Sequence, residues 1–169
     1  VGMMLSMRTG GKLILIPNPR DLGAVIKELR KHVIHSFPAV NTLFNGLANH
    51  PDFNTVDWSQ LKVSVGGGTA VQSAVAKLWL EKTGCPICEG YGLSESCAAT
   101  AFNPWDRPKI GTVGPVVPEI RLKIAADGEI AWQHDLVGND PAAAPQVGRE
   151  GLHRPARHRH QARIAIDQR

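Results

Sequence analysis

One stretch of the 169-residue chain gathers side chains that can do chemistry: residues 89–96 read Glu-Gly-Tyr-Gly-Leu-Ser-Glu-Ser. Gly90 and Gly92 lack a Cβ, so the backbone there can turn or lie close to a ligand. Tyr91 offers a flat aromatic face, and Glu95 offers the hard oxygen donor that Mg²⁺ prefers. The combination suits a nucleotide with its metal ion. The alternative is an ordinary turn in which Ser94 caps a helix.

A glycine triplet, Gly66 to Gly68, follows residues 61–65, which read Leu-Lys-Val-Ser-Val. The triplet is not a Walker phosphate loop, because no Gly-Lys-Ser/Thr follows it. It is not a dinucleotide fingerprint either, since Val71 stands where the third glycine would be. Ligands of open α/β sheets bind beyond the carboxyl ends of the strands. The triplet therefore marks either one wall of a binding site or a tight strand-to-helix turn.

Apolar periodicity predicts alternating strands and helices, and hence an α/β fold with a parallel sheet layer and flanking helices. Strands are expected at residues 12–16, 33–36, 61–65 and 86–88. Helices are expected from Leu22, with Asp21 as N-cap, from Pro38, and from Val71 to a C-cap at Gly84. The last helix is expected to bury one stripe of side chains: Val71, Ala74, Val75, Leu78 and Trp79.

The end of the chain has a different character. Residues 121–124 and 129–132 read as a short β-hairpin around Asp127 and Gly128. Residues 133–169 hold six arginines and no lysine, are rich in Ala, Pro and His, and are predicted to be an irregular, disordered tail. The expected division is therefore 1–132 and 133–169. For the tail, phosphate contacts to nucleic acid or a metal site at His153, His158 and His160 are weaker alternatives.

Composition restricts the class of protein only broadly. The net charge is +4, a mild basic bias. The sequence holds no run of about 20 apolar residues and no export leader, so a cytoplasmic location is expected, with attachment to the membrane surface left open. Cys85 and Cys88 have the redox Cys-x-x-Cys spacing, but they follow a predicted helix instead of opening one. Two buried thiols are therefore favoured over a redox or metal site.

Four segments together resemble the adenylate-forming superfamily, which contains acyl-CoA synthetases, luciferases and nonribosomal adenylation domains. Residues 91–95 are similar to its Tyr-Gly-(Leu/Met)-(Thr/Ser)-Glu motif. Residues 63–68 and 110–118 resemble the glycine segments on either side of that motif. Residues 38–45 are similar to the acyl-pocket segment of long-chain fatty acid-CoA ligases. The resemblance covers residues 1 to about 130.

The resemblance implies an internal fragment of the large N-terminal domain of such a ligase, and Val1 already lies inside a predicted helix. It implies formation of an acyl-adenylate from a fatty acid and ATP with Mg²⁺, then of a thioester with coenzyme A. Three of the family's motifs have no match: the phosphate loop ending in Pro-Lys-Gly, the Thr-Gly-Asp ribose motif, and the C-terminal catalytic lysine. We therefore expect negligible activity from this chain alone. A truncated or out-of-frame gene after residue 132 would explain the change at the tail.

The resemblance also implies roles for individual residues. The nucleotide-binding residues would be Gly67, Gly68, Glu89, Gly90, Tyr91, Gly92, Leu93 and Ser94. The acyl pocket would involve Phe44, Gly66 and Gly67, and the metal ligand would be Glu95. Phe44 can equally be a core aromatic residue of an amphipathic helix. The competing functions are a non-catalytic remnant, a basic nucleic-acid-interaction module acting through the tail, and another acyl-adenylating enzyme.

Overall fold

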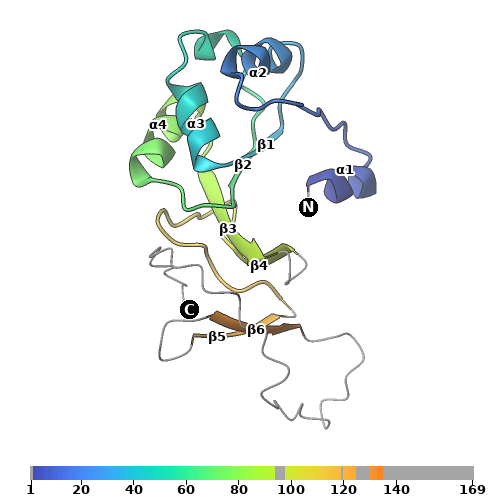
Figure 1. The fold of residues 1–169 in the computed structure, drawn as a ribbon, viewed down its shortest axis with the longest axis vertical. Helices are drawn as coiled ribbons and strands as arrows, with labels where there is room; N and C mark the ends of the chain where they lie inside the picture. The colour runs from blue at the N-terminus through green and yellow to red at the C-terminus, as the bar shows by residue number, and fades with distance from the viewer. Residues whose placement is uncertain (1, 94–97, 119, 125–129, 135–169) are drawn as a thin grey trace.

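The computed structural model describes residues 2–93, 98–118, 120–124 and 130–134 (Figure 1). The helices are α1 (Gly2–Thr9), α2 (Leu22–Leu29), α3 (Asn41–Ala48) and α4 (Ser73–Thr83), with a short 3₁₀ turn at Phe53–Thr55. The strands are β1 (Ser36–Ala39), β2 (Val63–Gly66), β3 (Ile87–Leu93), β4 (Ala98–Phe102), β5 (Ile120–Ile124) and β6 (Ile130–His134). Residues 133 and 134 of the predicted tail belong to β6, and the rest of the tail, 135–169, lies outside the described residues, as does the centre of the hairpin turn, 125–129.

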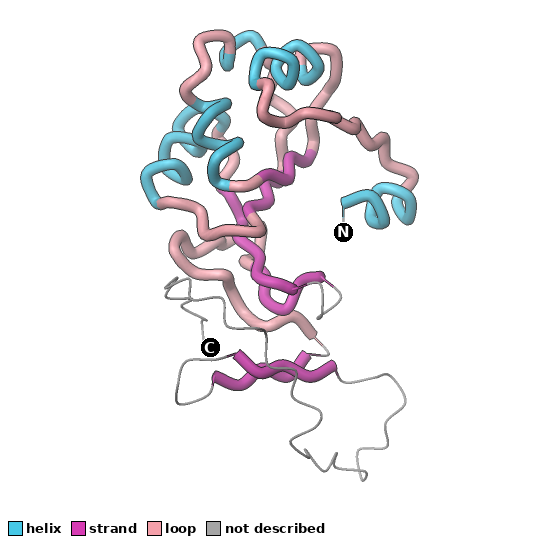
Figure 2. Tube along the Cα trace, in the orientation of Figure 1, coloured by secondary structure: helices cyan, strands magenta, loops and turns pink. Residues whose placement is uncertain are grey.

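Strands β1 to β4 form one sheet in sequence order. β1, β2 and β3 are parallel, and β4 returns antiparallel to β3. The connections after β1 and β2 carry helices α3 and α4, as parallel pairing requires. In Figure 2 the strands follow one another along the molecule, next to helices α3 and α4. The predicted α/β fold with a parallel layer and flanking helices is confirmed.

The strand predicted at residues 12–16 is wrong, since this segment has no regular secondary structure. Ile14 and Ile16 are partly buried against the core, whereas Leu13 and Leu15 are exposed. The alternation of a strand is thus present in the side chains. Among the described residues, however, no strand pairs with the segment, and an extended segment without a partner leaves its backbone groups without ladder hydrogen bonds.

The strand predicted at residues 33–36 is displaced toward the C-terminus. β1 includes Pro38, which had been predicted to open a helix, and α3 begins at Asn41. Pro38 is tolerated because β1 is an edge strand of the described sheet, where a missing N–H breaks no central ladder. Pro38 is paired in register with Val65 of β2.

Both predicted helix caps are confirmed. The Asp21 side chain accepts a hydrogen bond from the Ala24 backbone N–H at the start of α2, with a donor–acceptor distance of 3.0 Å. Gly84 ends α4 in the left-handed conformation, with φ 69°. The predicted buried stripe of α4 holds for Val75 and Trp79, and Val71 is buried just before the helix. The predicted burial is wrong for Ala74, which is exposed in the first turn of α4; this helix begins at Ser73 and not at Val71.

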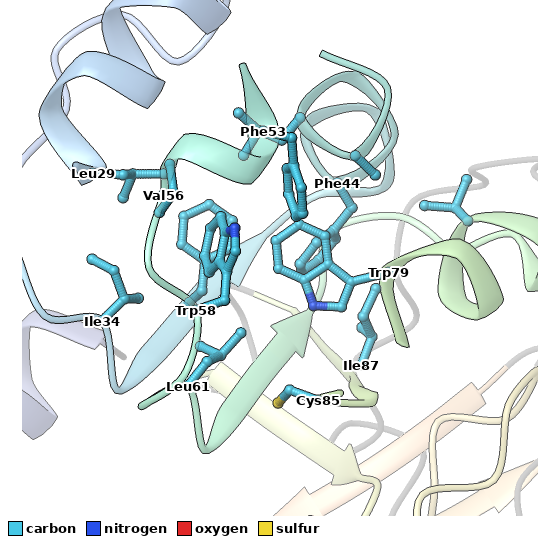
Figure 3. Packing of buried hydrophobic residues seen from close by; sticks show 14 of the residues in the cluster. Leu29, Ile34, Phe44, Phe53, Val56, Trp58, Leu61, Trp79, Cys85 and Ile87 are labelled. Atoms are coloured by element: carbon cyan, nitrogen blue, oxygen red, sulfur yellow. The ribbon is translucent and has the colours of Figure 1, made fainter. Parts of the chain in front are cut away.

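Aromatic side chains fill the space between the sheet and the helices (Figure 3). The ring of Phe37, from β1, stacks on Trp79 of α4 with centroids 5.6 Å apart. Phe44 meets Trp79 edge-to-face at 4.8 Å, and Phe53 stacks on Trp58 at 5.2 Å. Such pairs add stability beyond the burial of their area. This cluster fixes helices α3 and α4 against the parallel strands.

The predicted hairpin is present. β5 and β6 pair antiparallel, with Leu122 opposite Trp132 and Ile124 opposite Ile130. In Figure 1 the hairpin lies at the end of the molecule away from α2, α3 and α4. Across the described ranges, none of the helices is long and apolar enough to span a bilayer.

One buried hydrogen bond gives a test of this core. Trp79 Nε1–H donates to Ser64 Oγ at 2.9 Å. We expect Ser64→Ala to lower the free energy of unfolding by about 1–3 kcal/mol, because the indole N–H would stay buried without its acceptor. Urea unfolding measures the change. The control is Ser36→Ala in β1, where the side chain is exposed and the expected change is within about 0.5 kcal/mol. Equal losses in the two variants would contradict the assignment.

Candidate functional site

The carboxyl ends of the three parallel strands meet at one edge of the sheet. Ala39 of β1 pairs with Gly66 of β2, and Gly66 pairs with Glu89 of β3. The Gly67 backbone N–H donates to the Ala39 carbonyl at 3.3 Å. This is the edge at which ligands of α/β sheets bind. The register thus places the predicted Gly66–Gly68 and Glu89–Gly92 segments side by side.

Two glycines of the triplet are required by the geometry, for different reasons. A Cβ on Gly66 would lie 2.6 Å from Val71 Cγ2 and 2.9 Å from Ile87 Cγ2, so the turn is folded too tightly for a side chain. Gly68 has a φ of +77°, a conformation that other residues rarely adopt. Gly67 is less constrained, because its nearest neighbour would be the Gly90 carbonyl oxygen at 3.9 Å.

Glu89 joins three segments at this edge. Its residue is 6% exposed, and its Oε2 accepts a hydrogen bond from the Val71 backbone N–H at 2.9 Å. Its carbonyl oxygen accepts from the Asn103 N–H, also at 2.9 Å. The sequence analysis gave Glu89 only a backbone role, so the contact of its side chain was missed. The available signal was an acidic residue directly after the apolar pair Ile87 and Cys88.

The glycine-tyrosine-glycine motif lies within a strand and does not form a turn. Gly90, Tyr91 and Gly92 belong to β3, and the pairing with β4 shifts register between Tyr91 and Gly92. A Cβ on Gly90 would lie 2.9 Å from the Phe102 ring, so close approach here serves packing against β4. Tyr91 is half-buried, and burial raises the pKa of its phenol.

The structure brings together part of the predicted site. Gly66, Gly67, Glu89 and Gly90 are neighbours, and Tyr91 to Leu93 continue along β3. Phe44 lies fully buried in the aromatic core, against Phe37 and Trp79. Its predicted role at the acyl pocket stays a prediction. Ser94 and Glu95 lie outside the described residues, and so do His153, His158, His160 and the arginines of residues 149–169.

Asn103 was not recognised from the sequence, although it organises the segment beyond β4. Its side chain is buried, donates from Nδ2 to the Thr112 carbonyl, and accepts from the Lys109 N–H at 3.2 Å. Gly114 closes the same bend with a φ of +78°, and a Cβ there would overlap the Phe102 carbonyl. These contacts fix the conformation of residues 103–114, the segment that follows β4.

Cys85 and Cys88 are both buried and unbonded, which confirms the predicted pair of buried thiols. Burial raises the pKa of the Cys88 thiol, and the nearby Cys85 and Asp106 raise it further. A redox-active cysteine needs the opposite shift, toward the thiolate.

The described residues supply no ready metal site. Nowhere in these ranges do three His, Cys, Asp or Glu side chains gather closely enough to hold an ion. The carboxylate at the strand edge, Glu89, already receives the Val71 N–H. Magnesium therefore has no donor set here apart from the predicted ligand Glu95, which the structure does not describe.

The tight packing of the turn leads to a stability prediction. We expect Gly66→Ala to destabilise the protein by about 1–3 kcal/mol, because its Cβ would overlap two side chains in a packed region. The matched variant Gly67→Ala should stay close to the unaltered protein, since its Cβ meets only ordinary contact distances. Urea unfolding of both variants measures the difference. Equal stability of the two would show that the turn is not packed as described.

The Cys88 thiol leads to a prediction on pH. A pKa raised by folding means that the fold favours the protonated thiol, so this stabilisation is present below the ordinary thiol pKa of about 8.5 and is lost as pH rises through the folded value. Between about pH 8 and about pH 10, the unaltered chain should therefore lose more stability than Cys88→Ala. Urea midpoints across this range measure both slopes, and parallel slopes would contradict the assignment.

Comparison with known proteins places this site in a family. The family model described as AMP-binding enzyme matches residues 1–135. The long-chain-fatty-acid–CoA ligase of Haemophilus influenzae is 46% identical over 128 residues, which cover 75% of this chain and 23% of that protein. The chain thus spans about a quarter of the length of the curated relatives it matches.

Two solved structures share the fold. The anthranilate CoA ligase AuaEII, in complex with anthranoyl-AMP, superposes with a TM-score of 0.70 and 23% identity over 75% of this chain and 27% of that one. The inhibitor-bound N-terminal domain of FACL13 from Mycobacterium tuberculosis superposes with a TM-score of 0.66 and 22% identity. The match covers 90% of this chain and 42% of that one. The fold is that of adenylate-forming enzymes, and the family match over residues 1–135 shows that this chain belongs to the AMP-binding enzyme family.

Proposed function

We propose that this chain carries the adenylate-binding edge of a long-chain fatty acid-CoA ligase. In the complete protein, a fatty carboxylate attacks the α-phosphate of ATP to give acyl-adenylate and pyrophosphate. The thiol of coenzyme A then displaces AMP and forms the thioester. The substrates are thus a fatty acid, ATP and coenzyme A.

The observation that carries the proposal is the convergence of two sequence segments at one sheet edge. The glycine turn after β2 lies beside Glu89 and Gly90, where the parallel pairing of β2 with β3 ends. The glycine turn belongs to a segment that resembles the adenylate-forming superfamily, and Glu89 and Gly90 directly precede another, residues 91–95. The relative from Haemophilus influenzae is named as a long-chain-fatty-acid–CoA ligase. Similarity at 46% identity favours a fatty acid over the aromatic acid of the structural neighbour, which is 23% identical.

The proposed roles of individual residues are those that the family resemblance implies. Tyr91 stacks on the adenine, and the backbone from Glu89 to Gly92 borders the base. Leu93 completes the border of the base, and Ser94 contacts the phosphates. The backbone of Gly67 and Gly68 approaches the nucleotide. Gly66, Gly67 and Phe44 line the acyl pocket. Stacking needs only a flat ring, which Tyr91 provides from a half-buried position.

The reaction joins two anions, so its barrier is mainly one of charge repulsion, and catalysis requires cations and donors placed around the phosphates. Magnesium would supply such charge, with Glu95 as its proposed ligand. In the described part of the chain no three His, Cys, Asp or Glu side chains gather to hold the ion, and we assign no step to it. The family's phosphate loop, ribose motif and catalytic lysine have no match in this sequence. We therefore propose that the chain binds an acyl-adenylate but does not make one.

A binding measurement tests the proposal. We expect the chain to bind a non-hydrolysable long-chain acyl-adenylate analogue in calorimetry. Tyr91→Ala should weaken this binding about tenfold, because a base stacked on an aromatic ring contributes about 1–3 kcal/mol. Tyr91→Phe keeps the ring and should bind like the unaltered chain. Absence of binding by the unaltered chain, or equal weakening in both variants, would contradict the proposal.

A second measurement tests the absence of catalysis. With ATP, oleate and Mg²⁺, pyrophosphate release by the purified chain should stay at the background rate, because the family's phosphate loop and catalytic lysine have no match in this sequence. Release above background that disappears in the Tyr91→Ala variant would show that the chain is a competent enzyme.

A further inference from the structure

One residue of β3 holds both ends of the glycine turn. The backbone of Glu89 pairs with Gly66, the last residue of β2, where the turn begins. The side chain of Glu89 accepts the Val71 N–H at 2.9 Å, where the turn ends. Val71 is itself 4% exposed, so this hydrogen bond lies in a dry environment. The four residues in between, 67–70, are thus a loop closed by a single residue of the neighbouring strand.

Further hydrogen bonds hold the two ends of the turn, whereas its middle is exposed. The next amide, Gln72 N–H, donates to Asn41 Oδ1 at 2.9 Å, and Gly67 N–H donates to the Ala39 carbonyl at 3.3 Å. Residues 68–70 are exposed, and a Cβ on Gly67 would meet no atom closer than the Gly90 oxygen. The turn is therefore fixed at its edges and open along its centre, where a ligand could lie against the backbone.

A carboxylate in this position requires an explanation. Burying it costs free energy unless hydrogen bonds replace its water, and a hydrogen bond to a charged acceptor is stronger than one to a neutral acceptor. A turn with three successive glycines, in contrast, loses much conformational entropy when it is fixed. A strong acceptor at its end restricts the turn before any ligand arrives, so the ligand need not do so.

We propose that Glu89 is a positioning residue whose buried carboxylate, through the Val71 N–H, holds the Gly66–Gly68 turn in the conformation that accepts an acyl-adenylate. The carboxylate itself does not touch the ligand. This inference rests on the proposed function for the identity of the ligand, but the restraint on the turn stands independently of it.

Amide hydrogen exchange, followed by NMR, measures the restraint directly. In the Glu89→Ala variant the Val71 amide should exchange at least about tenfold faster than in the unaltered chain, because its acceptor is gone. Glu89→Gln keeps an acceptor oxygen and should retain the protection. The control is Glu81→Ala, which removes an exposed carboxylate from α4. Protection of Val71 that is unchanged in Glu89→Ala would overturn the proposal.

Calorimetry with the acyl-adenylate analogue measures the consequence for binding. Glu89→Ala should bind about tenfold more weakly, while Glu89→Gln stays within about threefold and Glu81→Ala is unchanged. Equal affinity of Glu89→Ala and the unaltered chain would overturn the positioning role. If the unaltered chain binds no analogue, the proposed function fails, and hydrogen exchange still decides whether Glu89 holds the turn. Should Glu89→Ala not fold, Glu89→Met takes its place, because it keeps the length of the side chain but offers no acceptor oxygen. Unchanged Val71 protection in Glu89→Met would overturn the proposal.

Discussion

The parallel register of three short strands is the constraint on which the candidate site depends. Ala39, Gly66 and Glu89 lie side by side at the strand ends, and each begins or borders a segment of the site. A shift of one residue would turn the Glu89 side chain to the other face of the sheet, away from the Val71 N–H. The aromatic core prevents such a shift, because Phe37 of β1 and Trp79 of α4 stack at 5.6 Å and Trp79 also donates to Ser64 of β2. Core and site are therefore two results of one packing arrangement.

Much of this arrangement is readable from the sequence because it is local. The Asp21 and Gly84 caps depend on residues within one turn of the helix end, and the hairpin was predicted from the adjacent pair Asp127 and Gly128. The segment at 12–16 has the composition of a buried strand. A strand forms only where a neighbouring strand pairs with it, and the pattern within one segment does not show whether such a neighbour exists. Pro38 was read by its preference for the first turn of a helix. An edge strand tolerates it equally well, and only the sheet order reveals that β1 lies at an edge.

The site shows the same limit. The glycine-rich segments were found because glycine types and spacing are visible in a single sequence, whereas the Glu89 and Asn103 side chains were missed because their partners, Val71 and Thr112, lie 18 and 9 residues away. An acidic residue that directly follows an apolar pair is nevertheless a usable signal. If the apolar pair is buried, the acidic side chain is buried with it, and a carboxylate is rarely buried without a donor. Gly90 is a different case, because its nucleotide-binding role stays a prediction while the structure supplies another reason for the glycine. Its missing Cβ was interpreted as room for a ligand, while the structure places the Phe102 ring there.

Binding and catalysis separate naturally in such a chain. Under the proposed function, interactions with the adenine and the acyl group are the same before and after the chemical step. They would lower the free energy of the ground state and the transition state alike and would not by themselves accelerate the reaction. Acceleration would come from groups that face the phosphates, where charge changes. The one carboxylate described at this edge, Glu89, is already bound to the Val71 backbone amide. A surface that binds an acyl-adenylate can therefore form from successive strands of one contiguous stretch without the groups that would stabilise the developing charge.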